Sequence, residues 1–213
     1  MRDLVIYGGG GLGKEVLSHV RATDPQGAQW NVLGFIDDFL PAGTRVSGHP
    51  VLGGFDWLAS RSHSTAVVMG LASPSAKADL YAKLKGNPHI TFPAFVHPQA
   101  LVESSAILAS GTVVSPFCFI AVDAALGICS FLNVGSQVGH DSVLGDFCSV
   151  MPHADVSGNV TVGERTLIGA GAKILQGLSI GSDVMVGIGS VVLKNVSDHS
   201  TIMGYPARVV KRE

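Results

Sequence analysis

A six-residue period runs through the second half of the chain and limits what the chain can fold into. Seventeen successive positions, six residues apart from Val96 to Val192, all hold an aliphatic residue. A second position, four residues after each of these, is mostly small and never charged, as at Ala106, Ser142 and Ala172. A period of six fits neither a helix nor an ordinary strand, so the repeating unit is a short strand followed by a turn.

The repeat predicts a parallel β-solenoid of triangular cross-section, in which three hexads make one coil and nearly six coils stack. The aliphatic residue should point into the prism, and the small residue should sit at the tight turn. Gly or Asn often follows the aliphatic residue, and we interpret these positions as turns that need a positive φ. They are Gly127, Asn133, Gly139, Gly145, Gly163, Gly169, Gly181 and Gly187. A calcium-binding solenoid would need nine-residue Gly- and Asp-bearing repeats, which the sequence lacks.

Composition narrows the classes of function. The chain has 213 residues, enough for one or two domains, and 46% of them are hydrophobic. A net charge of −2 without a basic run argues against nucleic acid as the partner. No apolar run is long enough to span a membrane and no signal sequence opens the chain, so we expect a cytoplasmic protein. Cys118, Cys129 and Cys148 are odd in number, which favours buried thiols over disulfides or zinc ligands.

The first 92 residues have the pattern of a small Rossmann-like α/β domain. Apolar runs at 4–7, 30–36 and 66–70 predict parallel strands, and Ser73 with Pro74 predicts the start of a helix. Residues 43–48 are polar and are expected to form a loop. Alternating strands and helices place any ligand beyond the carboxyl ends of the strands. We therefore predict a nucleotide-sugar-binding domain at 1–92 and a β-helix domain with a C-terminal tail at 93–213.

The run Gly8-Gly9-Gly10-Gly11-Leu12-Gly13 leads into the first helix and is a candidate phosphate site. Glycines let the backbone approach a phosphate, and a helix N-terminus supplies amide donors. Its G-x-G-x-x-G pattern could mark a dinucleotide site with an acid at Asp37 or Asp38, although the domain is too small for a dehydrogenase. It also approaches a P-loop, but Glu15 replaces the hydroxyl that would hold magnesium. A cradle for a nucleotide-linked substrate and a turn without a ligand remain.

Together these segments resemble a known family. The glycine-rich opening, Gly34-Phe35-Ile36-Asp37-Asp38, His97-Pro98 and the hexads resemble the bacterial hexapeptide-repeat acyltransferases that acetylate nucleotide-linked amino sugars, with the related sialic acid O-acetyltransferases. The resemblance covers essentially the whole chain. It implies a left-handed parallel β-helix, a UDP- or GDP-linked 4-amino-deoxy sugar as acceptor for surface glycan synthesis, acetyl-CoA as co-substrate, a homotrimer with active sites between subunits, and no metal. Sugar O-acetylation and a non-catalytic scaffold are the alternatives.

The resemblance also implies roles for single residues. Gly139-His140-Asp141 matches the family motif that carries the general base, so His140 should take the acceptor's proton and Asp141 should orient its ring. From the triplet alone, a surface histidine would be the plainer interpretation. Asn133 would help form the acceptor pocket or be a turn asparagine with positive φ. The nucleotide is expected on Gly8, Gly10, Gly11, Leu12, Gly13, Asp37 and Asp38.

Contacts with CoA are expected mainly from the prism backbone. The resemblance places them at Gly158, Ala170 and Ile188, and it places the adenine end beside Pro206 and Arg208 in the closing segment. The candidates for phosphate pairing are Lys173, Lys194, Arg208, Lys211 and Arg212.

Two positions depart from the family pattern. Leu12 and Ser149 stand where the family has histidines, and His153 lies near the second but out of phase with it. Leu12 cannot make a phosphate contact that a histidine side chain would make, so we expect the details of nucleotide binding to differ there, and we transfer no role to His153. His19, on the first helix, is expected at the surface.

Overall fold

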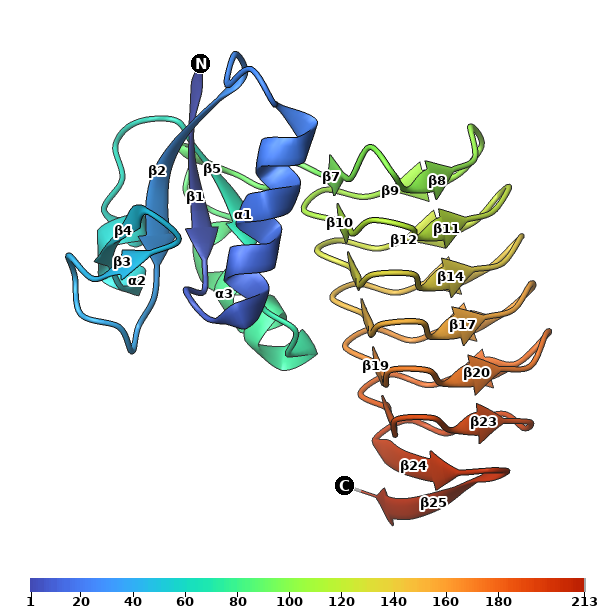
Figure 1. Ribbon diagram of the computed structural model, residues 1–213. Helices are drawn as coiled ribbons and strands as arrows, with labels where there is room; N and C mark the ends of the chain where they lie inside the picture. The colour runs from blue at the N-terminus through green and yellow to red at the C-terminus, as the bar shows by residue number, and fades with distance from the viewer. Residues whose placement is uncertain (213) are drawn as a thin grey trace.

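The computed structural model describes residues 1–212 as an α/β domain beside a long triangular prism (Figure 1). The α/β domain contains β1 (Arg2–Tyr7), α1 (Gly11–Thr23), β2 (Trp30–Ile36), β3 (Arg45–Val46), β4 (His49–Gly53), α2 (Phe55–Ala59), β5 (Thr65–Met69), α3 (Pro74–Leu84) and β6 (Ile90–Thr91). Its sheet has the order β3-β4-β2-β1-β5-β6, and only β3 and β4 pair antiparallel. Within residues 1–212, every helix is too short or too polar to cross a membrane.

Local sequence accounts for most of these elements. The helix α3 begins where the Ser73 side chain accepts a hydrogen bond from the Ala76 amide. The helix α1 begins at Gly11 without a side-chain cap and without an acid in its first turn. The prediction of a loop at 43–48 was wrong, because Ser47 and Gly48 both adopt positive φ and form a tight turn that pairs β3 with β4.

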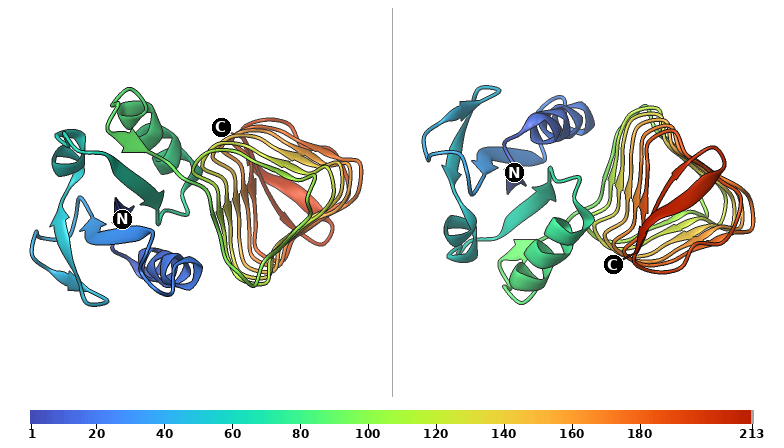
Figure 2. Two further views of the ribbon diagram at one scale, coloured as in Figure 1. Left: turned by 90° about the horizontal axis from the view of Figure 1, so that it is seen from above. Right: turned by 90° about the horizontal axis from the view of Figure 1, so that it is seen from below.

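The prism has three faces, which Figure 2 shows as the sides of a triangle. The first face contains β7 (Phe95–Val96), β10 (Val113–Val114), β13 (Phe131–Leu132), β16 (Ser149–Val150), β19 (Leu167–Ile168) and β22 (Met185–Val186). The second contains β8 (Leu101–Val102), β11 (Phe119–Ile120), β14 (Gln137–Val138), β17 (Asp155–Val156), β20 (Lys173–Ile174) and β23 (Val191–Val192). The third contains β9 (Ile107–Leu108), β12 (Ala125–Leu126), β15 (Val143–Leu144), β18 (Thr161–Val162) and β21 (Ser179–Ile180).

The chain visits the faces in the order first, second, third, and we number each corner after the face that precedes it. Strands on one face pair in parallel, as Val114 does with Leu132, so three hexads make one coil as predicted. The aliphatic positions from Val114 to Val192 are buried inside the prism. The last coil is shorter, because Val186 pairs with Ile202. The antiparallel pair β24 (Ser200–Gly204) and β25 (Ala207–Arg212) then closes the prism.

The glycines that follow the aliphatic residues do not have the positive φ that we predicted. The left-handed conformation lies two residues further on, as at Gly135 and Asp141, with φ of 65° and 57°. The glycines instead permit neighbouring coils to approach. A Cβ added to Gly139 would lie 2.4 Å from the amide nitrogen of Gly158, which belongs to the next coil. A side chain there would force the two coils apart.

The α/β domain packs on the first face and on the third corner of the prism. Val16 of α1 belongs to the same apolar cluster as Phe95, Val113 and Phe131 of the first face. On the other side, the ring of Tyr81 on α3 lies 5.6 Å from that of Phe147 at the third corner. The second corner, which joins the second and third faces, borders neither contact.

Two further predictions concern single side chains. His19 is buried against His97, with the ring centroids 5.5 Å apart, so the prediction of a surface position was wrong. Burial and the neighbouring His97 lower the pKa of His19 to about 4. Cys118, Cys129 and Cys148 are buried free thiols, as predicted.

Candidate active site

His140 and Asp141 form the candidate catalytic pair at the second corner. They follow β14, and the ring nitrogen Nδ1 of His140 lies 2.7 Å from Oδ2 of Asp141. Because a carboxylate only accepts hydrogen bonds, Nδ1 is the donor, and in the neutral ring Nε2 then has the free lone pair. The side chains of His140 and Asp141 are 48% and 53% exposed, so the pair lies at the surface of the prism. This is the arrangement that a general base with an orienting acid requires.

Gly158 lies directly below the imidazole in the next coil. A Cβ added to Gly158 would lie 2.5 Å from Nε2 of His140, closer than real Cβ contacts allow. The amide of Asn159 also donates to the His140 carbonyl at 2.8 Å and fixes the backbone of the base. Gly158 was expected to contact CoA; the structure places it where its missing side chain leaves room for the base.

The structure places Asn133 at the first corner, at the other end of the second face from His140. It is 7% exposed, and its Oδ1 accepts the Val134 amide at 2.7 Å. Its φ is not positive, so the turn-asparagine interpretation was wrong, because the left-handed residue of this turn is Gly135. Within one chain, Asn133 and His140 therefore do not share a corner.

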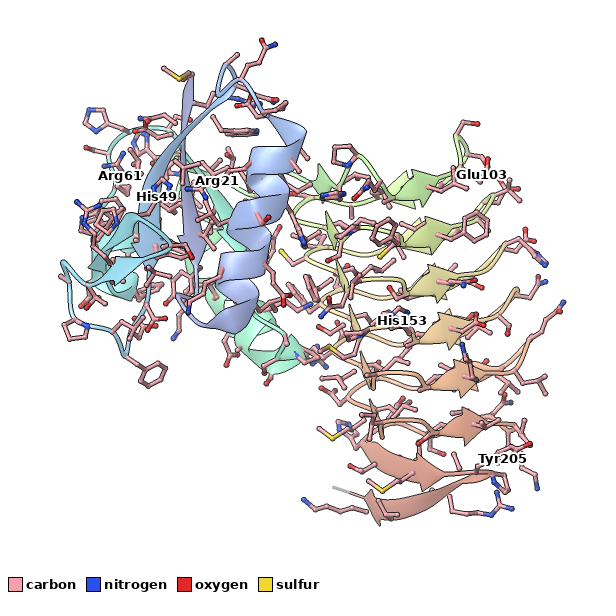
Figure 3. The ribbon with its side chains drawn as sticks, viewed as in Figure 1. Arg21, His49, Arg61, Glu103, His153 and Tyr205 are labelled. Atoms are coloured by element: carbon pink, nitrogen blue, oxygen red, sulfur yellow. The ribbon has the colours of Figure 1, made fainter. Side chains whose placement is uncertain are left out.

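Ser149, which replaces the second family histidine, and the nearby His153 have different surroundings. Ser149 lies on the first face, fully buried, and its Oγ has no hydrogen-bond partner. It therefore cannot present a side chain at the surface. His153 is exposed at the first corner on the second-face side (Figure 3), with its ring against Gly135 of the preceding coil.

The glycine turn joins β1 to α1 at the carboxyl edge of the sheet. Gly8 has a φ of 104°, and a Cβ on Gly13 would lie 1.8 Å from the Gly8 carbonyl oxygen, so the turn requires glycine at both ends. Gly10 and Gly11 have open space around their Cβ positions. Leu12 is partly buried against the apolar cluster under α1. The open amides of the first turn suit a phosphate.

Asp37 and Asp38 accept hydrogen bonds that fix the loops at this edge of the sheet. The carboxylate of Asp37 accepts hydrogen bonds from the amides of Gly9, Phe39 and Leu40 at 2.7, 2.9 and 3.0 Å. Partial burial raises the pKa of Asp37, but the three amides outweigh it and hold this pKa below its ordinary value. Asp38 accepts from the Tyr7 hydroxyl and from the Phe55 amide.

Two pockets open on either side of the Phe39 ring, which is 95% exposed. One, of about 490 Å³, contains Gly9, Gly10 and Lys14 together with Arg45. The other, of about 260 Å³, is lined by Tyr7, Asp38, Phe39, Phe55, Leu71, Ala76, Asp79, Leu80 and Lys83. The predicted glycine and Asp residues are thus brought together at one edge, as the topology requires. Phe39 was missed, because an exposed aromatic residue in a loop has no periodic signal.

The predicted CoA positions fall at two corners. Ala170 and Ile188 stack one coil apart at the first corner, where the Gly189 amide donates to the Ala170 carbonyl at 2.8 Å. Ile188 is 75% exposed. Gly158, in contrast to both, lies at the second corner. One chain does not bring these positions together.

A third pocket, of about 340 Å³, lies at the closing end of the prism and contains Lys194, Pro206 and Arg208. Tyr205, beside it at the hairpin tip, projects on the side away from the α/β domain (Figure 3). Lys173 pairs with Asp155 at 3.6 Å. The side chain of Arg212 lies outside the described part of the chain.

Comparisons with known proteins agree with this geometry. Residues 3–84 match the family described as the PglD N-terminal domain, and residues 141–176 match the bacterial transferase hexapeptide family. A GDP-perosamine N-acetyltransferase of Escherichia coli O157:H7 is 32% identical over 176 residues, which are 81% of this chain and 77% of that protein.

Solved structures match over nearly the full length. A mutant of perosamine N-acetyltransferase from Caulobacter crescentus, in complex with CoA and GDP-perosamine, has a TM-score of 0.88 and 30% identity over 99% of this chain and 98% of that one. The acetyltransferase domain of PglB from Neisseria gonorrhoeae, in complex with acetyl coenzyme A, has a TM-score of 0.89 and 28% identity over 98% and 99%. The chain therefore belongs to the hexapeptide-repeat, left-handed β-helix acyltransferase family that includes GDP-perosamine N-acetyltransferase, as its motifs predicted.

Proposed function

We propose that the protein transfers the acetyl group of acetyl-CoA to the amino group of a nucleotide-linked amino sugar. The observation that carries this proposal is the oriented imidazole of His140 on the prism, in a chain whose separate α/β domain has an uncapped glycine turn. Relatives of this chain bind CoA and GDP-perosamine or acetyl coenzyme A. A GDP-linked amino sugar is therefore the first acceptor to test.

The chemistry follows from the free Nε2 of His140. The amine nitrogen attacks the thioester carbon while Nε2 takes the proton from the nitrogen. Asp141 accepts the Nδ1 proton in a hydrogen bond and stabilises the imidazolium that forms. Backbone amides stabilise the tetrahedral oxyanion. When the intermediate collapses, the C–S bond breaks, the amide product forms, and CoA leaves with the proton that His140 held. No step requires a metal.

The proposal assigns the two parts of the chain different tasks. Residues 1–92 hold the sugar nucleotide. Its phosphates lie at the Gly8–Gly13 turn, and its other parts occupy the two pockets that flank Phe39. Residues 93–213 hold acetyl-CoA, with the adenine end near Pro206 and Arg208. Because acetyl-CoA and sugar nucleotides are cytoplasmic metabolites, we place the reaction in the cytoplasm.

A homotrimer with active sites between subunits is part of this proposal. The α/β domain packs on the first face and third corner of its own prism, whereas His140 lies at the second corner. The positions expected to bind CoA are likewise divided between the first and second corners. A neighbouring subunit would supply the α/β domain that faces His140 and would reunite the two halves of the CoA site.

The test is a thiol-release assay with acetyl-CoA across a panel of GDP- and UDP-linked amino sugars. Each amino sugar is paired with the analogue that carries a hydroxyl in place of the amine. We expect release with at least one amino sugar and none above background with its hydroxyl partner. Release only with hydroxyl acceptors, sialic acid included, would identify an O-acetyltransferase, and no release with any acceptor would contradict the proposal.

A further inference from the structure

Lys77 is the most unusual side chain outside the candidate active site. It lies on α3, whose other face lines the smaller pocket beside Phe39. Lys77 is only 1% exposed, and its Nζ donates to the carbonyl oxygens of Cys129 and Cys148, both at 2.9 Å. An amine so deeply buried is costly unless its hydrogen bonds are made. Its bonds therefore tie the helix to one place on the prism.

The two carbonyls lie at the ends of the coil that carries His140. Cys129 lies at the third corner, two residues before the start of β13, and Cys148 lies at the same corner one coil later, directly before β16. The chain between them passes through β13, β14, His140 and β15. Lys77 consequently attaches the α/β domain at the height of His140 along the prism.

Apolar packing alone is a weak way to set this height. The first face presents outward-facing side chains at the same place in successive coils, as Phe95, Val113 and Phe131 do. Contact of α1 with such a ladder is non-directional and changes little when the helix shifts along it. Hydrogen bonds from a single Nζ to two carbonyl oxygens lose their geometry within a fraction of an ångström.

We propose that Lys77 is a positioning residue for acetyl transfer, which fixes the height of the α/β domain so that its sugar nucleotide meets His140 of the neighbouring subunit. This inference rests on the proposed function. In a cyclic trimer whose axis runs along the prisms, all subunits lie at one height. A domain fixed at the level of its own His140 is thereby fixed at the level of its neighbour's. Lys77 itself touches neither substrate.

The first test is steady-state kinetics of Lys77→Met, which keeps the apolar length and removes the donors. We expect kcat to fall at least tenfold, while the dissociation constants for CoA and for the nucleoside diphosphate change less than threefold, because neither site contains Lys77. Lys77→Gln, which retains an N–H donor, should recover part of kcat and covers the case in which Lys77→Met does not fold. Lys85→Met, an exposed lysine just beyond α3, is the matched control and should be unchanged.

The second test does not depend on activity. Cys129 lies in the apolar cluster between α3 and the third corner, which Tyr81 and Phe147 also border. Cys118 and Cys148 lie in the prism core and serve as internal references. The rate of N-ethylmaleimide labelling at Cys129, followed by mass spectrometry, should rise at least tenfold in Lys77→Met while the references stay protected.

Each outcome decides between the alternatives. A wild-type kcat in Lys77→Met would overturn the positioning role. If Cys129 were reactive in that same variant, the lysine would only stabilise the contact between α3 and the prism. A wild-type enzyme that acetylates no nucleotide sugar would refute the proposed function instead. Labelling would then still decide the attachment, since an unreactive Cys129 in the variant would contradict it.

Discussion

At the scale of single residues, the geometry of the candidate base depends on the missing side chain of Gly158 as much as on the imidazole of His140. The imidazole occupies the volume that a side chain at 158 would fill. Asp141 contributes twice, because its φ of 57° lies in the left-handed region that Asp tolerates well, and its carboxylate reaches back to the ring before it. Neighbours in sequence thus become partners in the site.

Gly158→Ala should therefore impair catalysis without unfolding the prism. Its Cβ would approach Nε2 of His140 to 2.5 Å, so the exposed ring must rotate and lose its hydrogen bond to Asp141. We expect kcat to fall by roughly ten- to a hundredfold, in line with loss of an oriented base. Gly86→Ala is the control, since nothing lies within 4 Å of the position of its added Cβ. Equal kcat in both variants would contradict this account of Gly158.

At the scale of elements, the hexads determine the prism because every coil has the same pattern of aliphatic residues that must be buried. An inward aliphatic residue every six positions can be buried only when coils of 18 residues stack in register, and Val138 does pair with Val156. The turn conformation was predicted at the wrong position. Glycine is favoured both where φ is positive and where neighbouring coils approach closely, and the spacing of the glycines does not tell which of the two applies.

Other features of the elements have no sequence signal. Lys77 has the spacing of an exposed helical lysine, because the prism that buries it comes more than fifty residues later in the chain. The same holds for His19, which is buried only when α1 meets the first face. The His140–Asp141 pair was predicted from its motif, whereas the clearance at Gly158 required the next coil. Tertiary contacts, rather than local propensity, decide these positions.

Docking of α3 on the prism should make stability depend on pH. Desolvation lowers the pKa of Lys77 to about 7, and the nearby Cys148 and Cys129 oppose the shift only partly. The unfolded chain, with a lysine pKa near 10.5, then binds more protons than the native state above pH 7, so the free energy of unfolding rises with pH. Burial likewise raises the pKa of Cys129 to about 12 and that of Cys148 to about 11, and the charge of Asp146 adds to both shifts.

The same three thiols are present in the wild type and in Lys77→Met, so the difference between the two proteins isolates the contribution of Lys77. Urea unfolding at fixed protein concentration should show the wild type gaining roughly 2 kcal/mol relative to Lys77→Met between pH 7 and 8.5. The difference in the free energy of unfolding increases with pH because the buried site favours the neutral amine of Lys77. A difference that stays constant with pH, or that shrinks as pH rises, would contradict a buried lysine with a lowered pKa.

At the scale of the whole molecule, the chain separates its two binding surfaces. The α/β domain packs on the upper coils of the first face and on the third corner, and His140 lies at the second corner (Figures 1 and 2). The proposed function therefore predicts a site in which two chains lie side by side, one supplying the α/β domain and the other supplying His140.

Mixed subunits test this directly. His140→Ala removes the base, and Gly10→Asp places a carboxylate where the diphosphate should bind, at a helix N-cap where Asp is well tolerated. Each variant alone should be inactive. When the two are unfolded and refolded together in equal amounts, about a quarter of the sites pair an intact prism with an intact α/β domain, so about a quarter of wild-type activity should return. No recovery in proven mixed trimers would place the whole site within one chain.

The most direct test of the account is the rate of CoA thiol release by His140→Ala on the best sugar-nucleotide acceptor, measured beside the wild type. Loss of a general base predicts a fall in kcat of roughly 10²- to 10⁴-fold with the dissociation constant for CoA retained. His63→Ala, an exposed histidine of the α/β domain, should match the wild type. A His140→Ala enzyme that keeps wild-type turnover would contradict the assignment of the base and the mechanism built on it.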